Sequence, residues 1–287
     1  MKDRVGLGWR PELAAGILSN LASIDVVEVI ADDYFDSSRK VRRSLTTLAA
    51  QVAVTLHGVS LGMASCSPVE KKRLDKMARL VNEIEPGSWS EHLAFVRGGG
   101  IEIGHLTAAP RTVETIDATL QNLATARRIV GAAPQVENIA TLIEPPTSTL
   151  AEPAWLSAII RNSGCELLLD LHNVYANSVN FGHDPHEFIA SLPLDRVASI
   201  HLAGGKMIGP DDDRRLLDDH LHDVPDPVFA LLEEVAFRAP RPLSVILERD
   251  GSFPAMQDLI AQLDRARTAL AAGRARREIA SESAVAA

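Results

Sequence analysis

Histidine and carboxylate residues follow the short apolar runs of this 287-residue sequence with unusual regularity. All nine histidines lie between positions 57 and 222. The ends of the apolar runs carry ionisable residues, namely Glu28, His57, Glu91 with His92, Glu137, Asp170, His201 and Glu248. Imidazole nitrogens and carboxylate oxygens without thiolates suit zinc, iron or manganese better than calcium or magnesium. The sequence therefore predicts a transition-metal site.

The stretch WSEHLAF contains two neighbouring candidates, Glu91 and His92. Successive side chains of a strand point to opposite faces, so only one of the two can face inward. We expect His92 to bind the metal and Glu91 to serve packing or hydrogen bonding behind it. A single histidine at a strand end is more often an ordinary surface or core residue. The convergence of several such residues is what favours a metal site.

Two further segments carry clustered polar groups. In LLLDLHNVYANSVN, three leucines precede Asp170, and the connection beyond it carries His172, Asn173 and Asn180. In QVENIA, Asn138 can orient Glu137, although an ordinary salt bridge at a strand end is the alternative. Both segments are expected to contribute to the site.

The charged segment at 211–222 ends in a pair of interest. Asp218 and His220 are two residues apart, so in an extended backbone their side chains share one face and could bind one ion. The first residues of the segment are expected to be a solvated charged loop. Further on, VILERD places Glu248 after a β-rich run, with Asp250 available to support it.

These residues need elements that position them, and the sequence supplies a regular alternation. Eight short apolar runs lie at 5–8, 26–30, 52–56, 89–91, 135–136, 166–169, 197–200 and 243–247. Segments with helical periodicity follow them at 11–21, 39–50, 68–84, 113–130, 153–161, 184–191, 227–237 and 255–272. Eight βα units predict an α/β fold, a (β/α)8 TIM barrel, with a doubly wound open sheet as the alternative.

The barrel is expected to form a single catalytic domain over residues 1–272. The tail at 273–287 has charged and small residues but no apolar face, so we expect it to be disordered. Three connections are longer than the rest, at 96–111, 173–185 and 202–225, and each follows a strand. In a TIM barrel such loops meet at the C-terminal mouth, where active sites are built.

Composition narrows the class of protein further. Apolar residues make up 46% of the chain, typical of a globular protein, and 38 acidic against 29 basic residues give a net charge of −9. That charge repels a phosphate backbone, so we expect no nucleic-acid partner. The cysteines, Cys66 and Cys165, are too few for a disulfide framework. With no apolar segment long enough for a signal peptide or a membrane span, we expect a cytoplasmic protein without a membrane partner.

The ordered set of candidate ligands resembles that of a known family. The stretches that carry the resemblance are HGVSLGMAS, SEHLAFVRGGGIEIGHL, VENIATL, LLLDLHNVYANSVNFGHDP, IHLAGG and LERD. They are similar to signatures of the MNIO family, multinuclear non-heme iron-dependent oxidative enzymes that include the methanobactin biosynthesis oxidase MbnB. The similarity runs from residue 6 to about residue 270. The motifs SEHLAFVRGGG, NVYAN and HLAGG resemble those of another bacterial branch of the family rather than those of the methanobactin enzyme itself.

The resemblance implies a barrel of the xylose-isomerase-like kind that holds two or three irons of mixed Fe(II) and Fe(III) state. It implies molecular oxygen as co-substrate and the modification of a residue, commonly cysteine, in a ribosomally synthesised precursor peptide. The metal ligands that it implies are His57, His92 and Glu137 for one iron, Glu137, Asp170, His201 and Glu248 for a second, and Asn173, Asp218 and His220 for a third. Asp218 and His220 are also expected to be catalytic. No peptide-recognition domain is visible in the sequence, so we expect a separate partner protein to supply that function.

Two positions differ from the usual sequence motifs of the family. The usual HLAGH is here HLAGG, which ends in Gly205, and the usual D-T-H has Asp219 in the middle. Both changes leave the ligands intact and put substrate contacts near Gly205 and Asp219 in question.

Other functions share this ligand order. It is similar to that of endonuclease-IV-like barrels with three zincs, so the alternative is a zinc- or manganese-dependent hydrolase or isomerase. The net charge argues against a DNA substrate, and so does Asn173, which stands where the endonuclease pattern has histidine. A third interpretation is a non-catalytic protein that escorts a metal or a peptide. Metal analysis combined with oxygen consumption separates the three.

Overall fold

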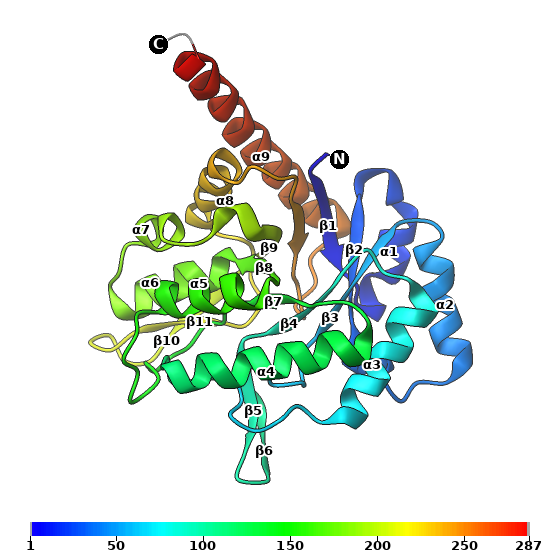
Figure 1. The fold of residues 1–287 in the computed structure, drawn as a ribbon. Helices are drawn as coiled ribbons and strands as arrows, with labels where there is room; N and C mark the ends of the chain where they lie inside the picture. Colours follow the sequence, from blue (N-terminus) through cyan, green and yellow to red (C-terminus); the bar gives the residue numbers. More distant parts are fainter. Residues whose placement is uncertain (1, 286–287) are drawn as a thin grey trace.

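A closed barrel of parallel strands forms the centre of the protein (Figure 1), seen here in a computed structural model that describes residues 2–285. The strands follow the order β1-β12-β9-β8-β7-β4-β3-β2 around the barrel. Their bounds are β1 Arg4–Gly8, β2 Val26–Ile30, β3 Ala53–Gly58, β4 Trp89–His92, β7 Gln135–Glu137, β8 Glu166–Asp170, β9 Val197–Leu202 and β12 Ser244–Leu247. Each overlaps one of the predicted apolar runs. The predicted TIM barrel is confirmed, and the open-sheet alternative is wrong because β1 pairs with both β2 and β12.

Helices surround the barrel and bury the outer face of its strands (Figure 1). The α-helices on the predicted segments are α1 Ala14–Ser19, α2 Arg39–Ala49, α3 Lys71–Ile84, α4 Val113–Val130, α5 Glu152–Ser163, α7 Pro185–Ala190, α8 Asp226–Arg238 and α9 Met256–Val285. Short 3-10 turns are η1 Pro11–Leu13, η2 Leu21–Ser23, η3 Ala31–Tyr34 and η4 Leu194–Arg196. None of the described helices has the length and apolarity that a bilayer crossing requires.

The barrel strands are apolar because both of their faces are covered, as in other parallel sheets. In β2, with the sequence VVEVI, the valines are fully buried. Glu28 interrupts this run and is itself only 3% exposed. A carboxylate buried in a strand needs a partner, and its partner lies in the site described below.

One of the three long connections was predicted wrongly. The segment at 173–185 is largely helical, because α6 covers Leu171–Phe181. Asp170 begins this helix by accepting a hydrogen bond from the backbone N–H of Asn173 at 2.7 Å, a typical N-cap. The polar residues that suggested a loop point inward, where Asn177 donates to the carbonyl of Ile139.

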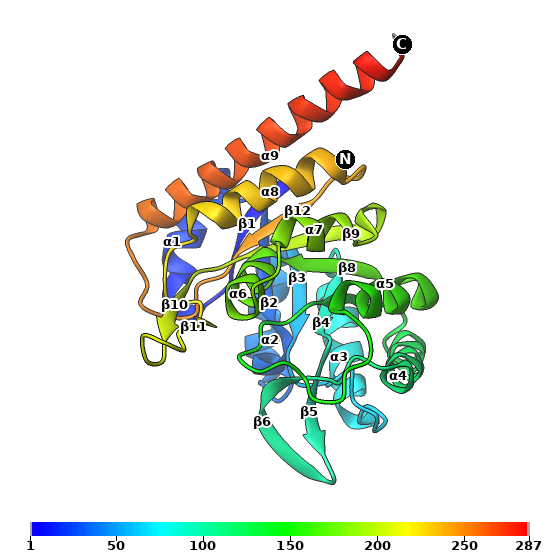
Figure 2. The same cartoon turned by 90° about the vertical axis from the view of Figure 1, so that its left-hand side faces the viewer.

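The other two long connections fold into hairpins. Residues 96–111 contain the end of β5 Ala94–Gly98 and all of β6 Ile101–Ala108, which pair antiparallel. Residues 202–225 contain β10 Gly205–Ile208 and β11 Arg215–Asp218, also antiparallel. Both hairpins follow barrel strands, and Figure 2 shows the β5–β6 hairpin projecting from the barrel.

The tail predicted to be disordered is helical as far as Val285, because α9 continues through it. Residues 286 and 287 lie outside the described part. Arg274 fastens the beginning of this extension by donating to both carboxylate oxygens of Asp3 and to the carbonyl oxygen of Ala236. Beyond that point α9 runs past the end of α8, as Figure 2 shows. Backbone anchoring by arginine, rather than an apolar face, explains why hydrophobic periodicity missed it.

Candidate metal centre

The register of the barrel brings the candidate ligands to one level at the C-terminal end. His92 of β4 is the register partner of Glu137 in β7. Asp170 of β8 is the register partner of His201 in β9. Neighbouring parallel strands therefore present these side chains side by side, which is the geometric basis of the two groups described next.

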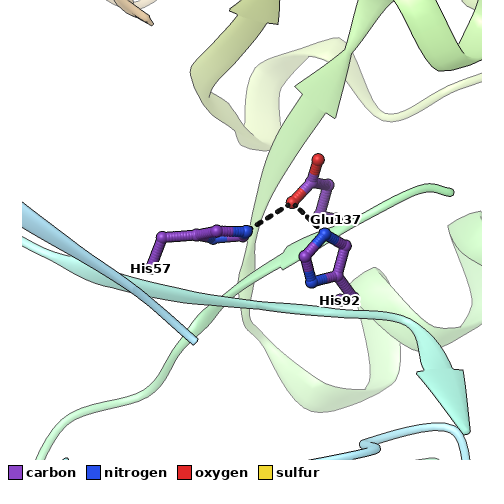
Figure 3. A group of neighbouring side chains, drawn as sticks. All are labelled: His57, His92 and Glu137. Carbon is purple, nitrogen blue, oxygen red and sulfur yellow. Dashed lines mark ion pairs between the residues drawn. The ribbon is translucent and has the colours of Figure 1, made fainter. Parts of the chain in front are cut away.

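The first group consists of His57, His92 and Glu137 (Figure 3), whose ligand atoms all lie within 4.8 Å of one another. Oε2 of Glu137 is 3.4 Å from Nε2 of His57 and 3.4 Å from Nε2 of His92. The two imidazole rings meet edge to face, with centroids 4.6 Å apart. Two ring nitrogens and one oxygen thus converge from three adjacent strands, which is an arrangement that could hold a metal ion.

The second group consists of Glu137, Asp170, His201 and Glu248, again with ligand atoms within 4.8 Å of one another, and all four residues are buried. Nδ1 of His201 is 3.2 Å from Oε1 of Glu137 and 3.0 Å from Oε2 of Glu248. Glu137 therefore turns one oxygen to each group. A carboxylate in that position can bridge two cations.

The third set, Asn173, Asp218 and His220, does not come together in the same way. Nε2 of His220 is 3.0 Å from Oδ2 of Asp218, so these two side chains do meet. They meet through a left-handed backbone at His220, with φ of 55°, and the extended backbone expected from the sequence is absent there. Asn173 instead donates its side-chain amide to the carbonyl of Asn138 at 3.0 Å.

Each imidazole of the two groups has a polar neighbour near its second nitrogen, although among the described residues Nδ1 of His92 and Nε2 of His201 are buried without a hydrogen bond. Nδ1 of His57 is 2.7 Å from the hydroxyl of Ser90, and Nε2 of His201 is 2.9 Å from Oε1 of Glu28. Oε1 of Glu91 accepts the backbone N–H of His92 at 3.0 Å and lies 3.8 Å from Nδ1 of its ring. Such partners fix ring orientation and tautomer in metal sites. The expected supporting position of Glu91 agrees with this geometry.

The sequence pattern did not single out Ser90, whose hydroxyl contacts the ring of His57. Glu28 was included with the ionisable residues at strand ends, but its more informative feature is its position inside the apolar run VVEVI. A buried carboxylate within a barrel strand is informative because burial without a partner is costly.

Residues that follow β1 and β12, Arg10 and Asp250, support His220. The guanidinium of Arg10 pairs with Oδ1 of Asp250. Oδ2 of Asp250 lies 3.2 Å from Nδ1 of His220, and the backbone N–H of Asp250 donates to the carbonyl of His220 at 2.9 Å. Arg10 and Asp250 together hold a residue whose backbone is in an uncommon conformation.

His172 completes this region from α6. The residue is fully buried, and its Nδ1 lies 2.6 Å from Oδ1 of Asp218. Asp218 thus lies between two imidazoles, those of His172 and His220.

The electrostatics of the site depend on burial and on close opposite charges. Burial alone would lower the pKa of His92, but the neighbouring carboxylates of Glu137 and Glu91 raise it to about 9. Burial would raise the pKa of Glu137, yet the three imidazoles around it bring the pKa below its ordinary value. Burial together with the charges of Asp218 and Glu137 raises the pKa of Asp170 well above its usual range. Asp170 is thus the carboxylate that most needs an added cation.

Unpartnered polar atoms test whether a metal fits here. Among the described residues, Oε2 of Glu137, Oδ2 of Asp170 and Oδ1 of Asn173 are buried and lack a hydrogen-bond partner. Buried oxygens are normally satisfied, so oxygens that converge without donors suit a cation. Neither cysteine belongs to the groups, and the donor set is nitrogen and oxygen alone. The residues fit a transition metal such as iron, manganese or zinc.

A pocket of about 580 Å³ leads to these residues from outside. Its polar lining includes His92, Glu137, Asn173, Asp218 and His220. All three residues of the third set therefore line this pocket, together with one histidine and the shared carboxylate of the first group. A substrate in the pocket would touch Asp218 and His220 directly.

Comparison with known proteins identifies the family. The model of the family described as "RiPP precursor modification enzyme MbnB/TglH/ChrH" matches residues 4–271. The chain belongs to this family. A UPF0276 protein of Caulobacter vibrioides is 33% identical over 273 residues, which cover 95% of this chain and 96% of that protein. A UPF0276 protein of Streptomyces avermitilis is 35% identical, and this chain spans only 54% of its length.

Solved structures share the fold of this RiPP-enzyme family member at low sequence identity. An L-ribulose 3-epimerase superposes with a TM-score of 0.63 at 16% identity and covers 97% of this chain, which in turn covers 98% of it. A xylose isomerase domain protein from Planctomyces limnophilus gives a TM-score of 0.56 at 15% identity, with 97% and 98% covered. These similarities establish the xylose-isomerase-like TIM barrel and nothing about substrate.

Proposed function

We propose that this protein is an iron- and oxygen-dependent oxidoreductase that modifies a residue, cysteine in the first place, of a ribosomally synthesised precursor peptide. The observation that carries the proposal is the shared position of Glu137 between two buried groups of nitrogen and oxygen donors. Membership in a family of precursor modification enzymes supports the peptide as substrate.

The ligands proposed for the irons are those of the two groups, with Asn173, Asp218 and His220 as the third set. Iron held by histidine and carboxylate with open positions supplies oxygen activation and one-electron chemistry when bound. The chain's own residues do the positioning. Ser90 contacts the ring of His57 and Glu91 accepts the backbone N–H of His92, while Nε2 of each ring faces Glu137. The second group is buried, whereas His92 and Glu137 also line the pocket through which a substrate would reach the centre.

Asp218 and His220 are the proposed catalytic pair. Both line the pocket, and Nε2 of His220 lies 3.0 Å from Oδ2 of Asp218, so a proton can be shared between them at the substrate. Arg10 acts on this pair only indirectly, because its side chain contacts Asp250. We include a separate peptide-recognition protein in the proposal as the partner that presents the precursor to the pocket.

Cysteine is the proposed target because a thiolate is a soft and strongly donating ligand that iron binds well. The pocket of about 580 Å³ can receive such a side chain together with its neighbours in a peptide.

The proposal is tested by coexpression with a short cysteine-bearing peptide encoded by an open reading frame beside the gene, if one is found there. We expect about two to three irons per chain in protein from iron-replete cells, by the ligand count, and a peptide mass change that requires iron and oxygen. The change should disappear in His57→Ala and persist in His186→Ala, which removes an imidazole of α7 outside the two groups. Stoichiometric zinc, with activity that survives iron removal, would overturn the proposal in favour of a hydrolase or isomerase.

The choice of cysteine has its own control. A precursor with serine in place of cysteine should leave the enzyme without a modified product. Equal modification of that precursor would show that another side chain is the target.

A further inference from the structure

The pocket over the candidate ligands has an apolar outer wall. The loops around it contribute polar side chains such as Thr107, Thr141 and Glu144, and they also contribute the apolar residues Leu106, Ile139, Leu142, Ile143 and Leu217. The wall suits a ligand that presents apolar side chains around one polar reacting group.

Exposed apolar residues also gather on the connections that form the mouth. Ile143 is 76% exposed and Leu142 is 37% exposed, both on the loop that follows β7. Ile101 and Ile103 are exposed on β6, in the hairpin that follows β4. Single exposed apolar residues are common on any protein, but several around one pocket indicate a binding surface.

The two hairpins beside the pocket differ in whether the backbone N–H and C=O groups of β11 and β6 have hydrogen-bond partners outside their own hairpin. In β11, Asn180 accepts the backbone N–H of Leu216 at 2.7 Å and donates to its carbonyl at 3.1 Å, so this edge is already capped. In β6, four consecutive residues at 105–108 line the pocket. Among residues 2–285, β6 pairs only with β5, and the register of that pair leaves 103–106 without partners.

We infer that the β6 edge is the docking strand for an extended peptide, whose apolar side chains flank the modified residue and pack on Leu142 and Ile143. An unpaired strand edge offers backbone hydrogen bonds to any extended chain, and the neighbouring pockets select the side chains. The inference rests on the proposed function for the identity of the occupant as the precursor peptide. To the proposed function it adds that the peptide lies along β6 and enters the pocket, and that the residues next to the modified residue are preferably apolar.

The test uses binding without turnover on the full chain as purified, kept free of oxygen. The probes are two fluorescein-labelled peptides without a thiol, Thr-Val-Leu-Ala-Leu-Val-Thr-Gly and its polar match Thr-Ser-Gln-Ala-Gln-Ser-Thr-Gly. Fluorescence anisotropy should give a Kd at least about tenfold lower for the apolar probe, since burying even one aliphatic side chain is worth that factor. Because neither probe carries the thiol, this result does not depend on iron or oxygen chemistry.

Two further measurements locate the surface. Ile143→Lys should weaken the apolar probe about tenfold or more, whereas Val41→Lys, at an exposed apolar position of α2, should leave the Kd unchanged. N-methylation of alternate probe residues should weaken binding as strongly, because it removes the backbone donors that pair with β6 without changing the protein.

Three outcomes would overturn the inference. They are equal Kd values for the two probes or no binding of the apolar probe, full affinity of the N-methylated probe, and self-association of the protein that Ile143→Lys abolishes. The last outcome would assign the surface to a second copy of the chain. A protein that binds the apolar probe as expected but modifies no precursor contradicts the proposed function alone.

Discussion

Nε2 of His201 lies 2.9 Å from Oε1 of Glu28, on the opposite side of the ring from Glu137 and Glu248. The ring therefore sits between a carboxylate inside β2 and the two carboxylates of the second group. With Nε2 facing Glu28, Nδ1 is left to face the metal position. The charge of Glu28 thereby favours Nδ1 as the ligand nitrogen of His201, although Nε2 makes no hydrogen bond within the described residues.

Glu28→Gln tests this relationship with little change in shape. The amide removes the negative charge that orients and polarises the ring, so affinity for metal in the second group should fall about 10- to 100-fold. Competition with a coloured chelator measures the affinity. Glu83→Gln, which changes a carboxylate of α3 paired with Arg42, is the matched control and should bind metal as the wild type does. An unchanged affinity in Glu28→Gln would show that His201 needs no such support.

The shared carboxylate should matter more than a peripheral ligand. Glu137 touches both groups, so Glu137→Ala should lose metal from both, whereas His220→Ala should lose at most one ion. Metal content per chain, measured on protein from iron-replete cells, distinguishes the two variants. If both variants keep the iron content of the wild type, the barrel mouth is not the metal site.

Gly58 leaves room for a residue that supports His92. A Cβ at position 58 would lie 2.6 Å from Oε2 of Glu91 and 3.0 Å from Cε of Met77. Gly58→Ala should therefore destabilise the protein by about 1–3 kcal/mol through overpacking, and should lower metal binding in the first group because Glu91 shifts. Urea unfolding and metal content measure the two effects.

The control for this variant is Gly87→Ala. A Cβ there meets the nearest atom, the carbonyl oxygen of Val54, at an ordinary 3.8 Å. Its stability should stay within about 0.5 kcal/mol of the wild type, with unchanged metal content. A Gly58→Ala protein that behaves like this control would show that Glu91 has space to adjust.

The ion pair between Asp3 and Arg274 should make stability depend on pH. Burial raises the pKa of Asp3, but hydrogen bonds from Arg274 and from the backbone of Leu243 outweigh it and bring the pKa below its ordinary value. A lowered pKa means that the ionised group stabilises the folded state above the unfolded pKa of about 3.9 and that this contribution is lost as the pH falls through the folded pKa. Asp3→Asn should thus be less stable than the wild type at pH 7, by about 1 kcal/mol or less, with a smaller difference near pH 3. Urea unfolding at both pH values gives the comparison, and a difference that grows in acid would contradict this origin.

The fold and the candidate ligands could be predicted because their signals are local, whereas the division of the ligands into groups came from the family resemblance. Each barrel strand is a short apolar run, and the ligand follows it at the strand end, as at His57, Asp170 and His201. The alternation of strands and helices then fixes the barrel, and the barrel brings strand ends to one mouth. The pairing of His92 with Glu137 follows from that topology alone.

The parts that the sequence did not reveal depend on contacts between distant residues. Helix α6 was missed because Asn177 and Asn180 look like loop residues until their partners Ile139 and Leu216 are known. The left-handed backbone at His220 has no decisive local signal, since only a few per cent of non-glycine residues adopt it even though histidine is among the more tolerant ones. That support comes from Asp250, thirty residues further along the chain.

The close packing around Gly205 restricts which residues can replace it during evolution. A Cβ at this position would lie 2.1 Å from the carbonyl oxygen of Leu217 and 2.8 Å from Cε1 of His172. A histidine at 205, as in the more usual HLAGH wording, therefore cannot arise here by a single substitution while β10 stays paired with β11 and His172 keeps its place. Because only the contact with His172 involves a side chain, a change at 205 should be accompanied by a change at 172 and by a shift of the β11 backbone at Leu217. Introducing histidine at 205 alone should therefore disturb the β10–β11 hairpin rather than only alter activity.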